Sequence, residues 1–506
     1  MRDESTSTLS DENRDVPYRS RRSPLPHQPQ DVASTRTEGI LPAAPGLWST
    51  LREAVRGSQA DLTSVPLRRA VLLLATPVVL EMSMESLFAV VDIFYVSRLG
   101  SEAVATVGLT ETMLSPVYAL SIGLSAGATA LIARRTGEKD ADGAATAAGQ
   151  VILVALVYAV LIGIGGALLA PTLLSAMGAS ESILAHGAPY ASTMLGGSLT
   201  IFLLFVFNAI FRSAGDSVIA MRSLWLANGL NIVVAPILIF GVGPIEGMGV
   251  LGAAVATTVS RGVGVLYQVS ILARGPRRPR LPFEPRHLAP RLHVMLRLIR
   301  LAWTATLQVL IETVSWLGLV RILAMFGSVA VAGYTIAMRI TTFVLLPALG
   351  LATSAATLVG QNLGAKEPER ARQSVHTIAL YNTGLLLLVG ATLALVPRAV
   401  LGVFTSDAGV LAYGADCLRI VALGFVMFAH GMVTIQAFNG AGDPVTPMAI
   451  NLGAFWLLRV PLAYVLAKLV GLGPHGVFIA ITASYSAQAI AGGIAFRLGK
   501  WKTKKV

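Results

Sequence analysis

The sequence contains very little cysteine and very little charge. Cys417 is the single cysteine, so the chain can form no intramolecular disulfide and no cysteine-ligated metal cluster. Charged residues make up only 13% of the 506 residues, whereas hydrophobic residues make up 54%. This balance is far too apolar for a soluble protein of such length. The composition therefore predicts an all-α polytopic membrane protein.

Several sequence motifs are also missing. No GxxxxGK[ST] segment is present, so the sequence has no candidate site at which ATP could bind and drive the protein directly. No convergent nucleophile or metal-ligating motif stands out, and we therefore expect neither an enzyme nor a bound metal or cofactor. The net charge of +12 does not indicate a nucleic-acid partner, because Lys and Arg are spread over loops instead of forming one basic face.

Apolar blocks between polar segments predict twelve membrane spans, each longer than the roughly 20 residues that a crossing needs. The loops on the side of the amino terminus carry most of the Lys and Arg, so the positive-inside rule predicts that both termini are cytoplasmic. We expect the protein in the cell (inner or plasma) membrane. The predicted spans are 69–97, 103–134, 143–170, 187–212, 218–240, 247–273, 293–325, 329–361, 372–396, 412–438, 445–470 and 476–498.

Polar segments divide the chain into five parts. Residues 1–66 are rich in Ser, Thr, Pro and Arg and predict a disordered cytoplasmic tail. The segment 274–291, RGPRRPRLPFEPRHLAPR, predicts a solvated cytoplasmic linker, because its prolines prevent a continuous helix. It separates two predicted six-helix bundles, 67–273 and 292–498, and residues 499–506 form a basic cytoplasmic tail.

The two halves repeat each other at one constant offset, the one that separates Glu85 from Glu312. This offset pairs a charged residue inside a span, several glycines and an AGD turn, which composition alone would not produce. Because each half has an even number of spans, the repeats are parallel (6+6) and related by a pseudo-twofold axis along the membrane normal. The pairs include Glu85 with Glu312, Gly137 with Gly364, Lys139 with Lys366, 214–216 with 441–443, and Gly249 with Gly476.

Three acidic residues lie inside the first span. Glu81, Glu85 and Asp92 fall within about 40° of one another around a helix, so they share one face. A charge exposed to lipid costs about 3 kcal/mol at mid-membrane, so this face must look toward protein or water and indicates a cation pathway. The seventh span mirrors it with Gln308 and Glu312. The alternative for Glu85 and Glu312 is a structural role, in which each is a protonated acid hydrogen-bonded between helices.

The first span, ATPVVLEMSMESLFAVVDIFYVSRLG, resembles that of the multidrug and toxic compound extrusion (MATE) family, with its proline at Pro77 and its acid at Asp92. The AGD turns after spans 4 and 10 also match. The resemblance implies a monomeric secondary antiporter that exports organic cations or drugs in exchange for H+ or Na+ by rocker-switch alternating access. It implies the cation-coupling residues Asp92, Asn231, Ala253 and Thr257, with a possible Na+ site at Asp92, Asn231 and Thr257. The shared helix faces add Glu85 to the coupling residues and predict a substrate cavity with Asp92, Glu85, Gln308 and Glu312.

The chain also departs from the family pattern. Ala235 stands before Pro236 where many prokaryotic members carry an aspartate, and Phe428 lies close to the position of an acid that one branch has in span 10. The sequence therefore leaves both H+ and Na+ open. The alternative function is a flippase for lipid-linked oligosaccharides or other lipids. Such a flippase would line its cavity with cationic residues, whereas the intramembrane charges considered above are acidic.

Overall fold

The computed structural model describes residues 46–244, 246–274 and 281–504 of the chain. The predicted tail up to residue 45 and the most basic part of the linker, 275–280, lie outside these residues. The unit that begins at Gly46 is built from α-helices, and its helices follow the predicted spans to within a few residues.

The amino-terminal half runs from α2 to α8. Its helices are α2 (Leu67–Ser97), α3 (Ser101–Gly137), α4 (Ala141–Ala176), α5 (Glu181–Gly196), α6 (Ser198–Ser213), α7 (Ser217–Phe240) and α8 (Val250–Ala273). The α5–α6 pair fills the place of one predicted span, 187–212.

The carboxy-terminal half repeats this order and adds two short π-helical segments. Its helices are α9 (Leu292–Leu323), α10 (Ser328–Gly364), α11 (Pro368–Leu395), α12 (Pro397–Gly402), α13 (Ala408–Leu423), α14 (Phe425–Gly440), α15 (Val445–Asn451), the π-helix Leu452–Arg459, α16 (Val460–Tyr464), the π-helix Val465–Leu469 and α17 (Pro474–Arg497).

Helix length and hydropathy agree with a twelve-span membrane protein. Among the described residues, eleven helical stretches are long and apolar enough to cross a bilayer, and α13 with α14, bent by 58°, supplies a twelfth. The predicted all-α membrane architecture in two six-helix repeats is thereby confirmed.

The repeat is visible in helix caps and breaks that the sequence analysis overlooked. Gly197 separates α5 from α6, and Gly424, its counterpart at the offset of the repeat, separates α13 from α14. The N-caps of α5 and α13 are Ser180 and Asp407, a pair at the same offset, and each side chain accepts a hydrogen bond from a backbone N–H three residues on. Such caps satisfy the free N–H groups of a first helical turn. The duplication therefore extends to local structure.

The offset changes in the last span, where one predicted pairing was wrong. Gly249 caps α8 with φ 57° and ψ −137°, and the residue with the same conformation before α17 is Gly473, at φ 57° and ψ −142°. Gly249 thus corresponds to Gly473 instead of Gly476. The reason is a shorter connection before α17, 470–473 against 241–249, combined with the π-helical turns before it.

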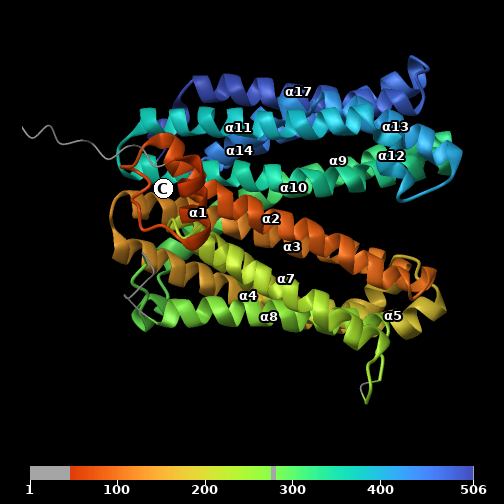
Figure 1. Ribbon diagram of the computed structural model, residues 1–506, viewed down its shortest axis with the longest axis horizontal. Coiled ribbons are helices and arrows are strands. Elements are labelled where there is room, and N and C mark those ends of the chain that lie inside the picture. The colour runs from red at the N-terminus through yellow and green to blue at the C-terminus, as the bar shows by residue number, and fades with distance from the viewer. Residues whose placement is uncertain (1–45, 245, 275–280, 505–506) are drawn as a thin grey trace, which may run out of the picture. The chain divides into compact units, whose positions relative to one another are not determined.

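The two halves meet through contacts that the repeat makes equivalent. Helix α3 packs on α9 and α10 packs on α2, and α3 also packs directly on its counterpart α10. Figure 1 shows the helices of the amino-terminal half, in orange to green, beside those of the carboxy-terminal half, in cyan to blue. A hydrophobic cluster separate from the two main cores joins α2 to α10, α11 and α14.

Residues 46–66 form a strap across the two halves, so the predicted disorder was wrong for this part of the tail. They include helix α1 (Leu47–Arg56), which packs on α2. Arg222 on α7 donates a hydrogen bond to the carbonyl oxygen of Arg56 at 2.9 Å. Arg370 on α11, in the other half, donates to the carbonyl oxygens of Leu62, at 3.0 Å, and Val65, at 2.5 Å.

The linker and the carboxy terminus are also more ordered than predicted where the structure describes them. Gln150 on α4 donates hydrogen bonds to the carbonyl oxygens of His287, at 3.1 Å, and Ala289, at 2.9 Å, so the end of the linker is fixed to the amino-terminal half. Trp501 is buried and stacks on Phe496 with ring centroids 4.6 Å apart. Apolar packing thus fixes part of the basic tail to the rest of the chain.

Candidate functional site

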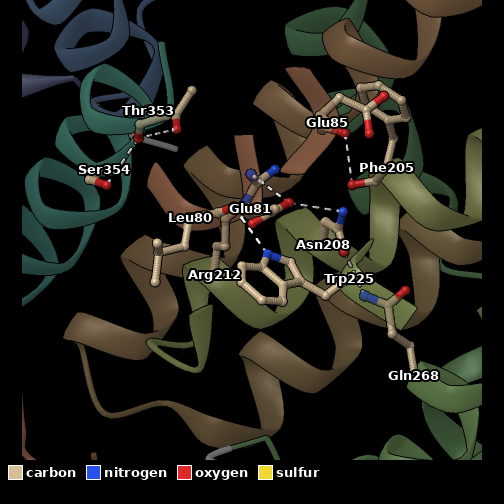
Figure 2. Close-up of polar contacts among 12 residues, drawn as sticks. Leu80, Glu81, Glu85, Phe205, Asn208, Arg212, Trp225, Gln268, Thr353 and Ser354 are labelled. Atoms are coloured by element: carbon tan, nitrogen blue, oxygen red, sulfur yellow. Dashed lines mark hydrogen bonds and ion pairs between the residues drawn. The ribbon is translucent and has the colours of Figure 1, made fainter. Parts of the chain in front are cut away.

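Glu81 is the centre of a buried polar network in the amino-terminal half. Its side chain is 0% exposed, and one carboxylate oxygen accepts a hydrogen bond from Asn208 at 3.1 Å and pairs with Arg212 at 3.4 Å. Gln268 on α8 donates to the amide oxygen of Asn208 at 2.6 Å. Figure 2 shows Glu81 between Asn208 and Arg212, with Gln268 on the far side of Asn208. The network joins α2, α6 and α8.

The carboxy-terminal half has a neutral counterpart of this ion pair. At the offset of the repeat, Gln308 stands for Glu81 and Asn439 stands for Arg212. Gln308 donates to the amide oxygen of Asn439 at 3.2 Å and to the carbonyl oxygen of Pro444 at 2.9 Å. Gln308 is only 5% exposed. Both of its bonds connect helices, because a buried amide needs partners.

Glu85 lies one helical turn beyond Glu81 and is half-buried. Asn228 on α7 donates a hydrogen bond to its carboxylate at 2.9 Å. The predicted common face of α2 therefore exists, with Glu81 and Glu85 both directed at helices of their own half. Asn228 thus joins α7 to α2 through Glu85.

Asp92 is half-buried near the other end of α2. Its Oδ1 atom is buried and has no hydrogen-bond partner among the described residues. Arg261 on α8 and Glu111 on α3 lie within electrostatic range of its carboxylate. An ionised oxygen in such a position is costly unless a proton, a cation or a donor satisfies it.

The predicted coupling residues are only partly brought together. Asn231 on α7 donates a hydrogen bond to Thr257 on α8 at 3.0 Å, and both side chains are buried. Ala253 lies one turn before Thr257 and is also buried. The structure gives Asp92 no direct bond to Asn231 or Thr257. The amide and hydroxyl thus form a pair of their own.

Glu312 lies on α9, half-buried and without a hydrogen bond among those of the described residues. Arg459, the last residue of the π-helix Leu452–Arg459, lies in the same half, and its charge acts on the carboxylate of Glu312. The pairing with Glu85 therefore holds in sequence and in helix position, whereas the polar surroundings of the two carboxylates differ.

Both halves of the chain match the same known protein family. The family model described as MatE matches residues 77–237 and, a second time, residues 305–465. These matches lie one in each half and together cover more than half of the chain. The chain belongs to the MatE family. The resemblance to multidrug and toxic compound extrusion transporters is thereby confirmed, and the chain is an integral membrane transporter of this family.

Individual MatE relatives are similar over most of their length. The "Probable multidrug resistance protein NorM" of Thermotoga maritima is 27% identical over 87% of this chain and 94% of its own. The "FAD transporter" of Shewanella oneidensis is 26% identical over 79% of this chain and 88% of its own. An outward-facing crystal structure of a multidrug resistance MATE transporter has a TM-score of 0.82, with 28% identity over 88% of this chain and 98% of that chain.

Sequence reasoning overlooked charged residues inside the spans of this MatE chain. Arg261 lies in the middle of α8 and donates a hydrogen bond to the hydroxyl of Tyr118 at 3.2 Å. Arg459 lies in the eleventh span, and Glu111 lies on α3. Positive charges were assigned to loops, yet the strings TTVSRGVG and WLLRVP each place one arginine in an apolar window. An arginine in such a window was the signal that could have identified both.

Proposed function

We propose that this MatE chain is a secondary antiporter that exports an organic cation or drug in exchange for H+ or Na+. The observation that carries the proposal is the buried, unpartnered Oδ1 atom of Asp92 on a half-buried acidic face. A proton or a Na+ ion supplies the missing partner, and release of that ion returns the carboxylate to a state that attracts a cationic substrate. Asn231 and Thr257 on α7 and α8 supply further oxygen atoms in the same half.

Export requires that the site face the two sides of the membrane in turn. The two six-helix halves are the moving units, and the contacts of α3 with α10 form the region about which they rock. The gradient drives export because ion and substrate bind with different relative affinity to the two facing states. The loops on the side of the amino terminus carry most of the Lys and Arg, and this positive charge supports a cytoplasmic location for both termini.

A second candidate function is transport of an anionic or lipid-linked substrate. Arg261 favours it, because a guanidinium in the middle of a span can pair with a phosphate or carboxylate. The similarity to a relative named as an FAD transporter points in the same direction. Arg261 lies within electrostatic range of Glu85 and Asp92, however, so its charge is balanced within the protein and the cation antiporter is the better supported function.

Transport in proteoliposomes separates the two functions. Purified protein is reconstituted, pH and Na+ gradients are imposed separately, and uptake of a panel of organic cations is compared with that of a flavin nucleotide. The antiporter predicts uphill movement of at least one cation under one of the gradients. Movement of the flavin nucleotide alone would reject the antiporter in favour of the second function.

A further inference from the structure

Arg459 lies in an aromatic cage in the carboxy-terminal half. Its side chain is 0% exposed, and its guanidinium carbon lies 4.0 Å from the ring centroid of Phe455, 5.0 Å from that of Tyr485 and 5.2 Å from that of Trp316. It ends the π-helical segment Leu452–Arg459. Single π-helical turns inside α-helices occur frequently at functional sites.

The cage leaves much of the guanidinium without hydrogen bonds. Nε donates to the hydroxyl of Ser484 at 2.7 Å, whereas Nη1 and Nη2 are buried and have no hydrogen-bond partner among the described residues. The ring faces stabilise a cation, but they do not neutralise it. A charge buried in this way requires a counter-ion, since its desolvation is otherwise uncompensated.

Glu312 is an acidic side chain placed to be that counter-ion. Its helix, α9, packs against the π-helix, and Ser315, three residues after Glu312, donates a hydrogen bond to the carbonyl oxygen of Phe455 at 3.0 Å. The charges of Arg459 and Glu312 act on each other, and both act on Tyr485. Glu312 thus lies within electrostatic range of Arg459, and the described residues show no direct salt bridge between the two.

The amino-terminal half has an uncharged residue where this half has Arg459. At the offset that pairs Glu85 with Glu312, Arg459 corresponds to Ile232, the residue after Asn231. Asn231 is neutral and bonds to Thr257. The equivalent position of the amino-terminal half therefore carries no fixed cation, and the intramembrane arginine of that half, Arg261, lies on α8 instead.

We propose that Arg459 is a positioning residue that serves as the fixed counter-ion of Glu312, so that the carboxy-terminal half takes up no coupling ion. The pairing of Arg459 with Glu312 concerns charge alone. The claim that the carboxy-terminal half takes up no coupling ion rests on the proposed antiport. The guanidinium charge of Arg459 stabilises the ionised form of Glu312. Coupling is then confined to the amino-terminal half.

A double-mutant cycle in thermal stability tests the pairing without any transport measurement. The variants are Glu312→Gln, Arg459→Met and the double variant, since Met fills a similar volume without charge. Glu312→Gln leaves Arg459 without its counter-ion and lowers the melting temperature by about 5 °C. The double variant recovers most of that loss. The exposed pair Asp416 and Arg419, 3.7 Å apart, is the matched control, and its cycle is additive. Additive losses for Glu312 and Arg459 would overturn the pairing.

Arg459→Lys keeps the cycle informative should Arg459→Met fail to fold, because it retains the charge and therefore remains sensitive to Glu312→Gln. The second readout is the number of ions exchanged per substrate. Arg459→Met frees Glu312 to take one more H+ or Na+, and the double variant returns the ratio to that of the wild type. If the number of ions exchanged per substrate is unchanged in Arg459→Met, the claim that Arg459 keeps a coupling ion out of the carboxy-terminal half is overturned. Absence of transport in the wild type would instead reject the proposed antiport and leave the stability cycle valid.

Discussion

Gly137 on α3 and Gly364 on α10 hold equivalent positions in the two halves, and each lies against the backbone of the other's helix. A methyl group at Gly137 would overlap the carbonyl oxygen of Gln361, and one at Gly364 would overlap that of Arg134. Only a residue without a side chain allows this crossing. The pseudo-twofold relation thus places the two glycines at a close contact between the halves.

Alanine at either glycine should separate the halves at this crossing. Overpacking of a tight contact costs about 1–3 kcal/mol, so Gly137→Ala and Gly364→Ala each shift the population toward a conformation with α3 and α10 apart. Distances between spin labels on the α3–α4 and α10–α11 turns measure the shift. Gly384→Ala is the control, because a methyl group there meets open space. Unchanged label distances in both variants would contradict the tight-crossing account.

We expect Arg370, and not Arg372 on the same helix, to hold the strap in place. Arg370→Ala removes the hydrogen bonds to the carbonyl oxygens of Leu62 and Val65, so residues 58–66 should exchange backbone hydrogen at least about tenfold faster, as expected for a loss of about 1.5–3 kcal/mol. Arg372→Ala, which breaks an exposed pair with Glu369, is the control and should change little. Equal exchange in the two variants would show that Arg370 does not hold the strap.

The docking of α1 should depend on pH through Glu53. Its carboxylate accepts a 2.6 Å hydrogen bond from Ser58 and pairs with Arg69 at 2.9 Å, and these contacts, the Ser58 bond foremost, hold the pKa of Glu53 below its ordinary value of 4.5. A carboxyl whose pKa is lowered by folding stabilises the docked state above its unfolded pKa and loses this effect as the pH falls through the folded pKa.

Glu53→Gln should therefore speed hydrogen exchange in α1 relative to the wild type at pH 7, and the two proteins should converge below pH 4.5. The difference is small, at most about 1 kcal/mol, because the pair is about one-third exposed. The ratio of exchange rates at each pH cancels the intrinsic pH dependence. A ratio that stays constant from pH 7 to pH 3 would exclude Glu53 as the titrating group.

The neutral pair Gln308 and Asn439 can be introduced into the amino-terminal half by substituting Glu81 and Arg212. Glu81→Gln alone leaves Arg212 without its partner and should destabilise the protein by about 1–3 kcal/mol. Glu81→Gln with Arg212→Asn recreates the amide pair and should recover a good part of that loss. Thermal unfolding of the two variants and of Arg212→Asn alone measures the coupling. A double variant as unstable as the sum of the single variants would refute the equivalence of the two networks.

The sequence predicted the spans and the repeat well because both depend on local composition. Apolar blocks and matched residues such as Glu85 and Glu312 are visible in one dimension. The partner of Glu81 was not predictable, since Arg212 lies on a helix distant in the sequence, α6. The π-helical turn before Arg459 also left no pattern, because it changes backbone hydrogen bonding without changing which residues are apolar.

The strap and the linker show a different limit. Leu47–Arg56 lies in a segment whose overall composition predicted a disordered tail, yet it forms a helix because α2 offers it a surface and Arg222 binds its last carbonyl group. The lysines after residue 499 likewise concealed the burial of Trp501. Composition indicates whether a segment can pack alone, and these segments pack only against other parts of the chain.

The central claim is that Asp92 carries ion coupling, with Glu85 modulating it. Its most direct test is uphill efflux in proteoliposomes by Asp92→Asn, which keeps size and hydrogen bonding while removing the charge. Glu102→Gln, at an exposed carboxylate that begins α3, controls for loss of a surface acid. The account predicts that Asp92→Asn, folded and monodisperse, loses gradient-driven efflux, that Glu85→Gln only reduces it, and that Glu102→Gln keeps it. Wild-type efflux by Asp92→Asn under both pH and Na+ gradients would contradict the account.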